Sequence, residues 1–272
     1  MPRICAIAVD VDGTLLNSKG RLPPGTLEAL RHCVRKGILL YLATARPRRL
    51  IFREGEVPGE VDFLKTGGVF YNGAVAVDDS IGIYTHWPIA GDIVSATVGL
   101  LEAFGSDIQI ALQFEERYHS FRLPIGGSDL QRWGFAPDEL VPYAEAREWD
   151  CSKIVAFHES RELGDACDHL TQRLGEELTV FGSDSGRWIQ IMSRQATKER
   201  ALIYLFSTRG ISADSVVVFG DDSPDIGMLK SFTHSVAMGN ASESVKETAA
   251  YVTRSSDEDG IVHALREYFE LI

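Results

Sequence analysis

Short apolar runs alternate with helical patterns in the first third of the chain. Ile4–Val9 and Ile38–Ala43 are nearly continuous apolar runs, which are typical of buried parallel strands. Between them, Thr26–Lys36 has the pattern of a helix that ends at Gly37. The next signals are a strand near Phe63–Thr66 followed by Gly67-Gly68, then Val69–Tyr84 with turns at Asn72-Gly73 and Asp78-Asp79-Ser80. The alternation predicts a parallel sheet built from strand–helix units.

The pattern changes from about Trp87, where strands follow one another through short turns and two helices lie among them. The helices are expected at Ile93–Phe104 and Ser160–Leu174, and the segment 124–150 is the least regular. The expected strands are Ile108–Phe114, Tyr118–Leu123, Lys153–His158, Leu178–Phe181 and Trp188–Met192. This mixture is typical of an α+β module.

The alternation of strands and helices resumes after Met192. Thr197 is a suitable N-cap for a helix to Thr208. The later elements are a strand at Ser215–Phe219, a helix near Asp225–Ser231, a strand at Ser235–Met238, a helix at Ser242–Ala250, a strand at Tyr251–Thr253 and a helix from about Asp259. The predicted fold is therefore α/β, with a Rossmann-like parallel-sheet core (1–85 and 191–272) interrupted by an inserted α+β cap domain (86–190).

Composition narrows the range of partners. The 272 residues are 44% hydrophobic and 24% charged, as in ordinary globular proteins, and the formal net charge is −12. That charge argues against nucleic acid as a partner. No apolar stretch has the length of a membrane span, and two aspartates interrupt the N-terminal apolar run, so neither a membrane partner nor a signal peptide is expected. Four cysteines without Cys-x-x-Cys spacing favour buried free thiols and a cytoplasmic location. The oligomeric state stays open.

Two of the predicted strands end in aspartates. Asp10 and Asp12 follow the first strand, and Gly220-Asp221-Asp222-Ser223-Pro224-Asp225 follows the strand near Phe219. An Asp-X-Asp-Gly segment alone is also a common turn. Two acidic strand ends far apart in sequence instead favour one site for a hard cation such as Mg²⁺. Its expected ligands are Asp10, the carbonyl of Asp12, and Asp221, with Asp225 supporting them from behind.

Thr44 and Lys198 indicate what such a site would bind. Thr44 ends the second strand, where a hydroxyl and backbone N–H groups at a helix start form an anion site. Lys198 lies in the first turn of a predicted helix, where the helix dipole disfavours a cation. A lysine there is either solvated or bound to an anion. Together with the acidic residues and Thr44, phosphate becomes the better explanation.

These residues resemble the haloacid dehalogenase superfamily of phosphatases, and more narrowly its Cof-like branch, which has a large inserted cap. The matching segments, in order, are Asp10-Val11-Asp12-Gly13-Thr14-Leu15, Ala43-Thr44-Ala45-Arg46, Asn72-Gly73-Ala74, Lys198, Gly220-Asp221-Asp222 with Asp225, Val236–Ala241 and Asp257-Glu258-Asp259-Gly260. A glycine is more usual in the family where this chain has Ala45. The cap matches only in its place and its mixture of strands and helices.

The resemblance implies a mechanism. Asp10 would attack phosphorus to form an aspartyl-phosphate, Mg²⁺ would neutralise the phosphoryl charge, and Asp12 would act as general acid and then general base. The implied phosphate-binding groups are the side chains of Thr44 and Lys198 and the backbone N–H groups of Val11 and Ala45. Arg46 and Asn72 would bind substrate, although Arg46 alone also fits an exposed helix start and Asn72 an Asn-Gly turn.

One position departs from the branch pattern. Pro224 stands where the branch usually has an asparagine that helps to bind phosphate, and proline offers neither a side-chain donor nor an N–H. Either phosphate binding is weaker, another group substitutes, or the chain is a poor phosphatase.

The predicted function is a Mg²⁺-dependent phosphomonoester hydrolase. Its substrate is expected to be a small phosphorylated metabolite, with a sugar phosphate as the first guess and the cap setting specificity. The alternatives are a phosphomutase of the same fold, a receiver-like phosphoacceptor module, and a weakly active or inactive protein that binds phosphorylated ligands.

Overall fold

The computed structural model describes residues 3–52, 55–57, 61–115, 118–133, 135–183 and 186–272. The chain divides into two compact units, of which the first is Met1–Thr85 with Thr197–Ile272 and the second is His86–Ala196. The chain returns to the first unit at Thr197 and not at residue 191, because the last strand of the second unit continues to Ser193. Within the described ranges, no helix is long and apolar enough to cross a membrane.

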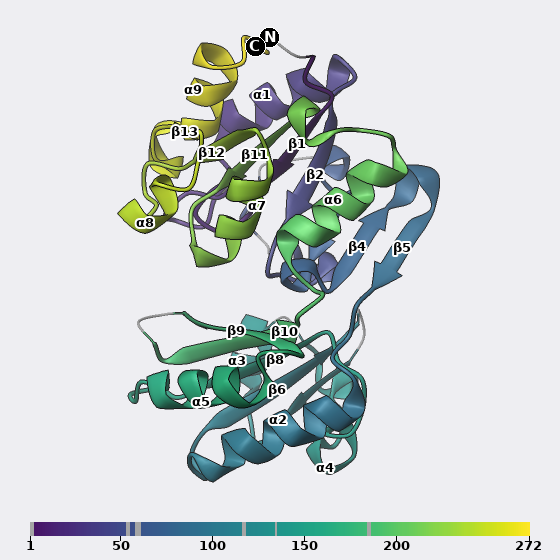
Figure 1. Ribbon diagram of the computed structural model, residues 1–272, viewed down its shortest axis with the longest axis vertical. Helices are drawn as coiled ribbons and strands as arrows, with labels where there is room; N and C mark the ends of the chain where they lie inside the picture. Colours follow the sequence, from purple (N-terminus) through teal and green to yellow (C-terminus); the bar gives the residue numbers. More distant parts are fainter. Residues whose placement is uncertain (1–2, 53–54, 58–60, 116–117, 134, 184–185) are drawn as a thin grey trace. The chain divides into compact units, whose positions relative to one another are not determined.

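An eight-stranded sheet forms the centre of the first unit (Figure 1). Its strand order is β13-β12-β11-β1-β2-β3-β4-β5, and the pairs from β13 to β3 are parallel, whereas β3 and β4 are antiparallel. The strands are β1 (Ala6–Val9), β2 (Leu39–Ala43), β3 (Gly67–Phe70), β4 (Val75–Asp78), β5 (Ile83–His86), β11 (Val216–Gly220), β12 (His234–Ala237) and β13 (Tyr251–Val252). Every residue of β1 and β11 is buried, as their apolar sequences predict.

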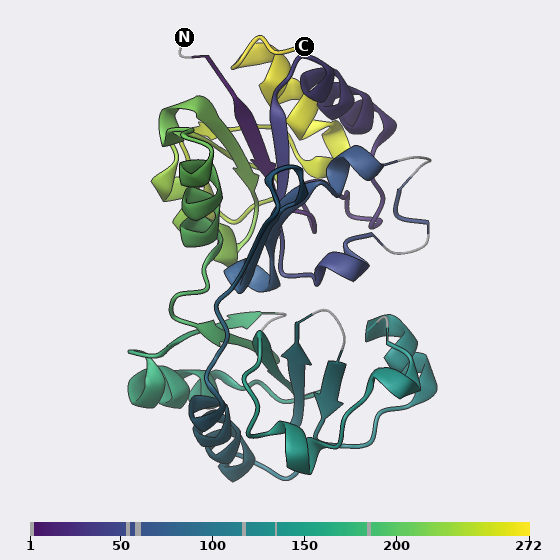
Figure 2. The same cartoon turned by 90° about the vertical axis from the view of Figure 1, so that its right-hand side faces the viewer.

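Helices cover both faces of this sheet. α1 packs with α9 on one face and α6 packs with α7 on the other (Figure 2). The helices of this unit are α1 (Pro24–Arg35), α6 (Lys198–Thr208), α7 (Ile226–Ser231), α8 (Glu243–Lys246) and α9 (Gly260–Glu267). Pro24 opens α1, where its fixed φ and missing N–H cost nothing.

The third strand lies later in the chain than its sequence pattern predicts. Asp62–Leu64 is a 3₁₀ turn, and the strand is Gly67–Phe70. The two glycines belong to the strand because its neighbours approach closely: a Cβ on Gly68 would lie 2.4 Å from the Leu42 carbonyl oxygen, and one on Gly67 2.9 Å from that of Val77. The prediction treated these glycines as a strand end and was wrong.

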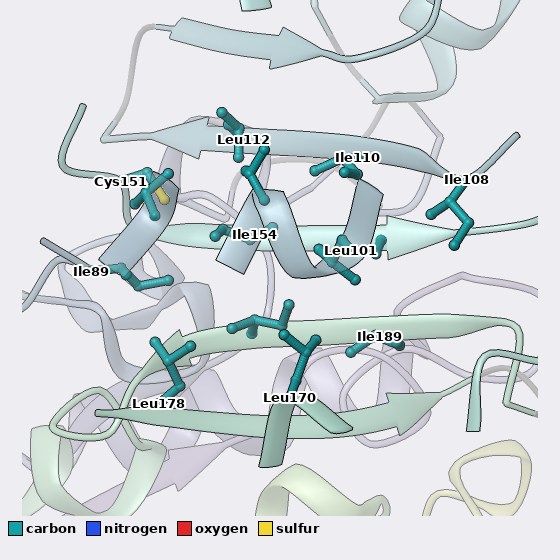
Figure 3. Close-up of a cluster of buried hydrophobic side chains, with 14 of the residues drawn as sticks. Ile89, Leu101, Ile108, Ile110, Leu112, Cys151, Ile154, Leu170, Leu178 and Ile189 are labelled. Atoms are coloured by element: carbon teal, nitrogen blue, oxygen red, sulfur yellow. The ribbon is translucent and has the colours of Figure 1, made fainter. Parts of the chain in front are cut away.

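The second unit has a five-stranded antiparallel sheet in the order β7-β6-β8-β10-β9. Its elements are α2 (Gly91–Ala103), β6 (Gln109–Phe114), β7 (Tyr118–Phe121), α3 (Gly127–Trp133), α4 (Tyr143–Ala146), β8 (Lys153–Phe157), α5 (Gly164–Leu174), β9 (Leu178–Ser183) and β10 (Trp188–Ser193). Alternate residues of β6, β8 and β10 pack with apolar residues of α2 and α5 to form the core of this unit (Figure 3). The predicted fold class, a parallel-sheet α/β core with an inserted α+β unit, is confirmed.

Strand register brings three chain segments to one edge of the first sheet. In β1, Val9 pairs with Leu42 of β2 on one side and with Phe219 of β11 on the other. The carboxyl ends of β1, β2 and β11 are therefore level, and the residues that follow them lie side by side.

Candidate active site

The acidic residues predicted to form a metal site lie together at this edge. Asp10 follows β1 directly, and its N–H donates to the Phe219 carbonyl at 3.0 Å, so the strand pairing extends to Asp10. Asp221 follows β11, and Asp225 lies one turn later. One carboxylate oxygen from each of Asp10, Asp221 and Asp225 lies within 4.8 Å of the other two. The side chain of Asp12 is not part of this cluster.

Lys198 joins the cluster from the start of α6. Its Nζ donates to Asp10 Oδ1 at 2.6 Å and to Asp225 Oδ1 at 2.7 Å, and the side chain is only 3% exposed. Thr197 caps the helix by accepting the Arg200 N–H, as its sequence position predicts. Because Lys198 is buried and binds two carboxylates, it is not a solvated surface lysine.

Glycine at position 73 lets the turn after β3 approach the start of α6. A Cβ there would lie 2.3 Å from the carbonyl carbon of Thr197, and Gly73 has φ +113°. The close approach of the Asn72-Gly73 turn therefore helps to fix the position of Lys198 at the start of α6.

Burial and the repulsion between like charges shift the pKa values of the groups in this cluster. Burial raises the pKa of Asp10 well above its ordinary value, Asp225 and Asp221 add to the shift, and Lys198 opposes it. Burial likewise raises the pKa of Asp221 to about 6, against a hydrogen bond from Thr14. Burial acts to lower the pKa of Lys198, but Asp10 and Asp225 outweigh it and raise the pKa. Three carboxylates with one ammonium leave an excess of negative charge that a cation would relieve.

Two residues to which sequence analysis gave no role orient Asp221. The hydroxyl of Thr14 donates to Asp221 Oδ1 at 2.7 Å, and Asn240 Nδ2 donates to Oδ2 at 3.1 Å and to the Gly13 carbonyl at 2.9 Å. Gly13 has φ +82°, and a Cβ there would lie 2.3 Å from Asp221 Oδ2. Both Thr14 and Asn240 stand in segments that carry the family resemblance, which was the available signal.

Asp225 holds the loop after β11. It is 1% exposed, and its Oδ2 accepts the backbone N–H groups of Asp221 and Asp222 at 3.0 and 3.2 Å. Because its Oδ1 is bound to Lys198, both oxygens are engaged with protein donors. Pro224 lies in the 3₁₀ turn Ser223–Asp225, near the start of a helix, where a missing N–H is tolerated.

Three of the four predicted phosphate-binding residues, Val11, Thr44 and Ala45, follow the ends of β1 and β2. Val11 and Thr44 are fully buried, and Ala45 comes directly after Thr44. Thr44 Oγ1 accepts the Arg46 N–H at 3.1 Å, and its carbonyl accepts the Asn72 N–H at 2.9 Å. Asn72 is therefore brought beside the end of β2, with its side chain buried.

Asp12 and Arg46 form a separate group with Glu56. Arg46 binds both carboxylate oxygens of Asp12, through Nε at 2.9 Å and Nη2 at 2.5 Å, and it also binds Glu56. Burial acts to lower the pKa of Arg46, but the hydrogen bonds to Asp12 and Glu56 raise it further than burial lowers it. No sequence signal marked Glu56, which lies in a loop without a recognisable motif.

A parallel sheet with aspartates and a buried lysine at the carboxyl ends of its strands suits phosphoryl transfer to an aspartate. The sequence profile of the haloacid dehalogenase-like hydrolases matches residues 7–265, so the chain belongs to that family. The class predicted from sequence, a Cof-like phosphatase, is confirmed by this match and by the relatives below.

Curated relatives align with the chain over nearly its whole length. The 5-amino-6-(5-phospho-D-ribitylamino)uracil phosphatase YitU of Bacillus subtilis is 26% identical and shares 97% of each chain. The phosphatase YwpJ of the same organism is 29% identical, over 96% of this chain and 98% of its own. Among solved structures, the subclass IIB sugar phosphatase BT4131 matches with a TM-score of 0.82 and 25% identity, covering 98% of this chain and 99% of its own.

Proposed function

We propose that this protein hydrolyses phosphate monoesters of small polar metabolites, with Mg²⁺ as cofactor and Asp10 as nucleophile. The observation that carries the proposal is the contact of Lys198 with Asp10 and Asp225 beside Asp221. A buried ammonium between carboxylates holds the nucleophile in one orientation, and the same ammonium can bind a phosphoryl oxygen.

The residues of the acidic cluster suit a Mg²⁺ ion. The donors are oxygens, which Mg²⁺ prefers, and Gly13 leaves space beside Asp221 that a side chain would fill. Asp10, Asp221 and the carbonyl of Asp12 would hold the ion, whereas Asp225, with both oxygens engaged, would support Lys198 and the loop. When bound, the ion supplies charge neutralisation for the phosphoryl group.

Different residues of this chain carry out nucleophilic attack, proton transfer and phosphate binding. Asp10 attacks phosphorus and forms an aspartyl-phosphate while the alcohol leaves. Asp12 gives the leaving oxygen a proton and later takes one from the water that hydrolyses the intermediate. Lys198, the Thr44 hydroxyl and the N–H groups of Val11 and Ala45 hold the phosphoryl oxygens throughout.

For the substrate, we propose a phosphate ester at the end of a hydroxylated carbon chain. The named activities of YitU and BT4131 support this, since a ribityl phosphate and a sugar phosphate share that group. Asn72 contributes to the substrate site by this proposal. Selection among substrates is assigned to the inserted unit, because the candidate catalytic groups all lie in the first unit.

Phosphate release from a panel of esters tests the proposal. We expect turnover of ribitol 5-phosphate or glucose 6-phosphate with Mg²⁺, slower turnover of nucleotides, and loss of turnover in excess chelator that Mg²⁺ restores. Full activity in excess chelator would contradict the metal assignment. A preference for phosphoproteins or nucleic-acid ends would contradict the substrate class.

Replacing Pro224 with asparagine is expected to strengthen phosphate binding. The substitution adds an amide donor where the family usually has one, and a hydrogen bond to a charged group contributes roughly 1.5–3 kcal/mol. Loss of the proline ring costs about 0.4–1 kcal/mol of stability through the unfolded chain. The measurement is the inhibition constant of inorganic phosphate.

The matched control for this prediction is Pro224→Ala, which removes the ring without adding a donor. We expect Pro224→Ala to lose stability and gain no phosphate affinity. An inhibition constant that is the same in both variants would show that the phosphate site is complete without asparagine.

A further inference from the structure

Arg46 has no hydrogen-bond donor left for a substrate. A guanidinium carries five N–H groups, and all five are used inside the first unit. They bind the two oxygens of Asp12, the two oxygens of Glu56 and the Ile51 carbonyl, at 2.5–3.0 Å. This arrangement is unlike that of a substrate-binding arginine, which needs donors directed at open space.

We propose that Arg46 is a positioning residue that holds the carboxylate of Asp12 for proton transfer, with Glu56 fixing Arg46 from the other side. This inference rests on the proposed phosphatase reaction. It replaces the substrate-binding role that the sequence suggested for Arg46.

Exposure differs among the three side chains in the way that this role requires. Arg46 is 10% exposed and Glu56 is 12% exposed, so the ion pair between them is shielded from solvent. Asp12 is 59% exposed, so its carboxylate stays accessible to a leaving group and to water. An ion pair shielded in this way is stronger than an exposed one, because water screens it less.

The geometry of the contact restricts how Asp12 turns. Nε and Nη2 bind the two oxygens of Asp12 as a fork, which fixes the plane of the carboxylate as well as its position. Nη1 and Nη2 bind Glu56 at 2.6 and 3.0 Å, and these bonds hold the guanidinium in place if the Asp12 side chain moves. A lysine in place of Arg46 would keep the charge and lose the fork.

Asp12 gives up one proton in the first step of the proposed reaction and takes one back in the second. A carboxylate oxygen of Asp10 bonds to phosphorus as the bond between phosphorus and the ester oxygen breaks, and Asp12 gives its proton to that oxygen, so the alcohol leaves and Asp12 becomes a carboxylate. Water then attacks the phosphorus of the aspartyl-phosphate, Asp12 takes the water proton, and phosphate and free Asp10 result. The fork of Arg46 fixes the orientation of the Asp12 carboxyl group in both steps.

The test compares two leaving groups. An alkyl ester such as ribitol 5-phosphate needs a proton on its leaving oxygen, whereas p-nitrophenyl phosphate releases a stable anion. We expect Arg46→Gln to lower kcat/KM for the alkyl ester by about 100-fold, as for a misplaced catalytic group, and to change kcat/KM for the aryl ester little. Arg46→Lys should fall between Arg46→Gln and the wild type. Glu56→Gln should show a smaller loss with the same dependence on leaving group.

Arg209 provides the matched control. It makes a comparable fork to a carboxylate, donating to Asp78 Oδ2 at 2.6 Å and Oδ1 at 2.8 Å, and it is not part of the candidate site. Arg209→Gln should lower thermal stability and leave the ratio of the two kcat/KM values unchanged. Circular dichroism checks the fold of every variant, and Glu56→Gln decides the outcome if Arg46→Gln does not fold.

Three results would overturn the proposal. Equal losses for both esters would mean that Arg46 does not act through Asp12, provided that the wild type is active and Asp10→Asn is not. A rise in KM at constant kcat would make Arg46 a substrate ligand. Absence of phosphate release from the wild type with every ester would overturn the proposed function itself, and the role of Arg46 with it.

Discussion

Asp10→Asn is expected to abolish phosphate release while the protein stays folded. An amide is a poor nucleophile, and loss of the nucleophile in a hydrolase costs on the order of a millionfold in kcat. The fold should survive because Lys198 keeps its contact with Asp225, and because burial already disfavours the charge on Asp10. Single-turnover phosphate release, circular dichroism and thermal unfolding are the measurements.

The control for this substitution is Asp62→Asn, in the same unit. The Asp62 side chain is 91% exposed, and it forms an ion pair with Lys65 on the surface. This variant should keep wild-type turnover. A folded Asp10→Asn protein with a near-wild-type rate would show that the nucleophile is another group.

Lys198→Met is expected to lower the free energy of unfolding strongly and to abolish turnover. Removing one partner of a buried ion pair leaves an uncompensated charge, which typically destabilises a protein by about 3–5 kcal/mol. Here two carboxylates lose the same ammonium, at 2.6 and 2.7 Å. Urea unfolding gives the change in free energy, and phosphate release gives the loss of activity.

A second substitution separates charge from packing. In Lys198→Met with Asp225→Asn, one of the two unpaired carboxylates is gone, so part of the stability should return while turnover stays absent. The two substitutions contact the same group, so their effects on stability should not add. A wild-type urea midpoint for Lys198→Met alone would show that the ion pairs contribute nothing to the fold.

Sequence patterns could predict the acidic cluster because its geometry follows from strand order. Residues that end parallel strands share one edge of a sheet, so the sequence alone places Asp10 and Asp221 together. The position of Lys198 followed from a helix start with an N-capping threonine. These features depend on local patterns and on one general rule of α/β folds.

The contacts of Arg46 could not be predicted in the same way. Glu56 lies ten residues after Arg46 in a loop without periodicity, and nothing in the sequence fixes how such a loop returns to the site. The glycines of β3 were misread for a related reason. Their role depends on how closely Leu42 and Val77 approach, and only the assembled sheet determines that distance.

The discontinuity of the first unit determines when the candidate active site can form during synthesis. β1 pairs with β11, more than two hundred residues later in the chain, whereas His86–Ala196 is one continuous segment. As the chain leaves the ribosome, the inserted unit can fold while β1 still lacks the partner that it needs on one side. Asp10 meets neither Lys198 nor Asp221 until the segment after residue 197 has emerged. The nascent chain therefore carries no assembled candidate catalytic cluster through most of its translation, and the site is expected to be completed last because long-range strand pairs form slowly.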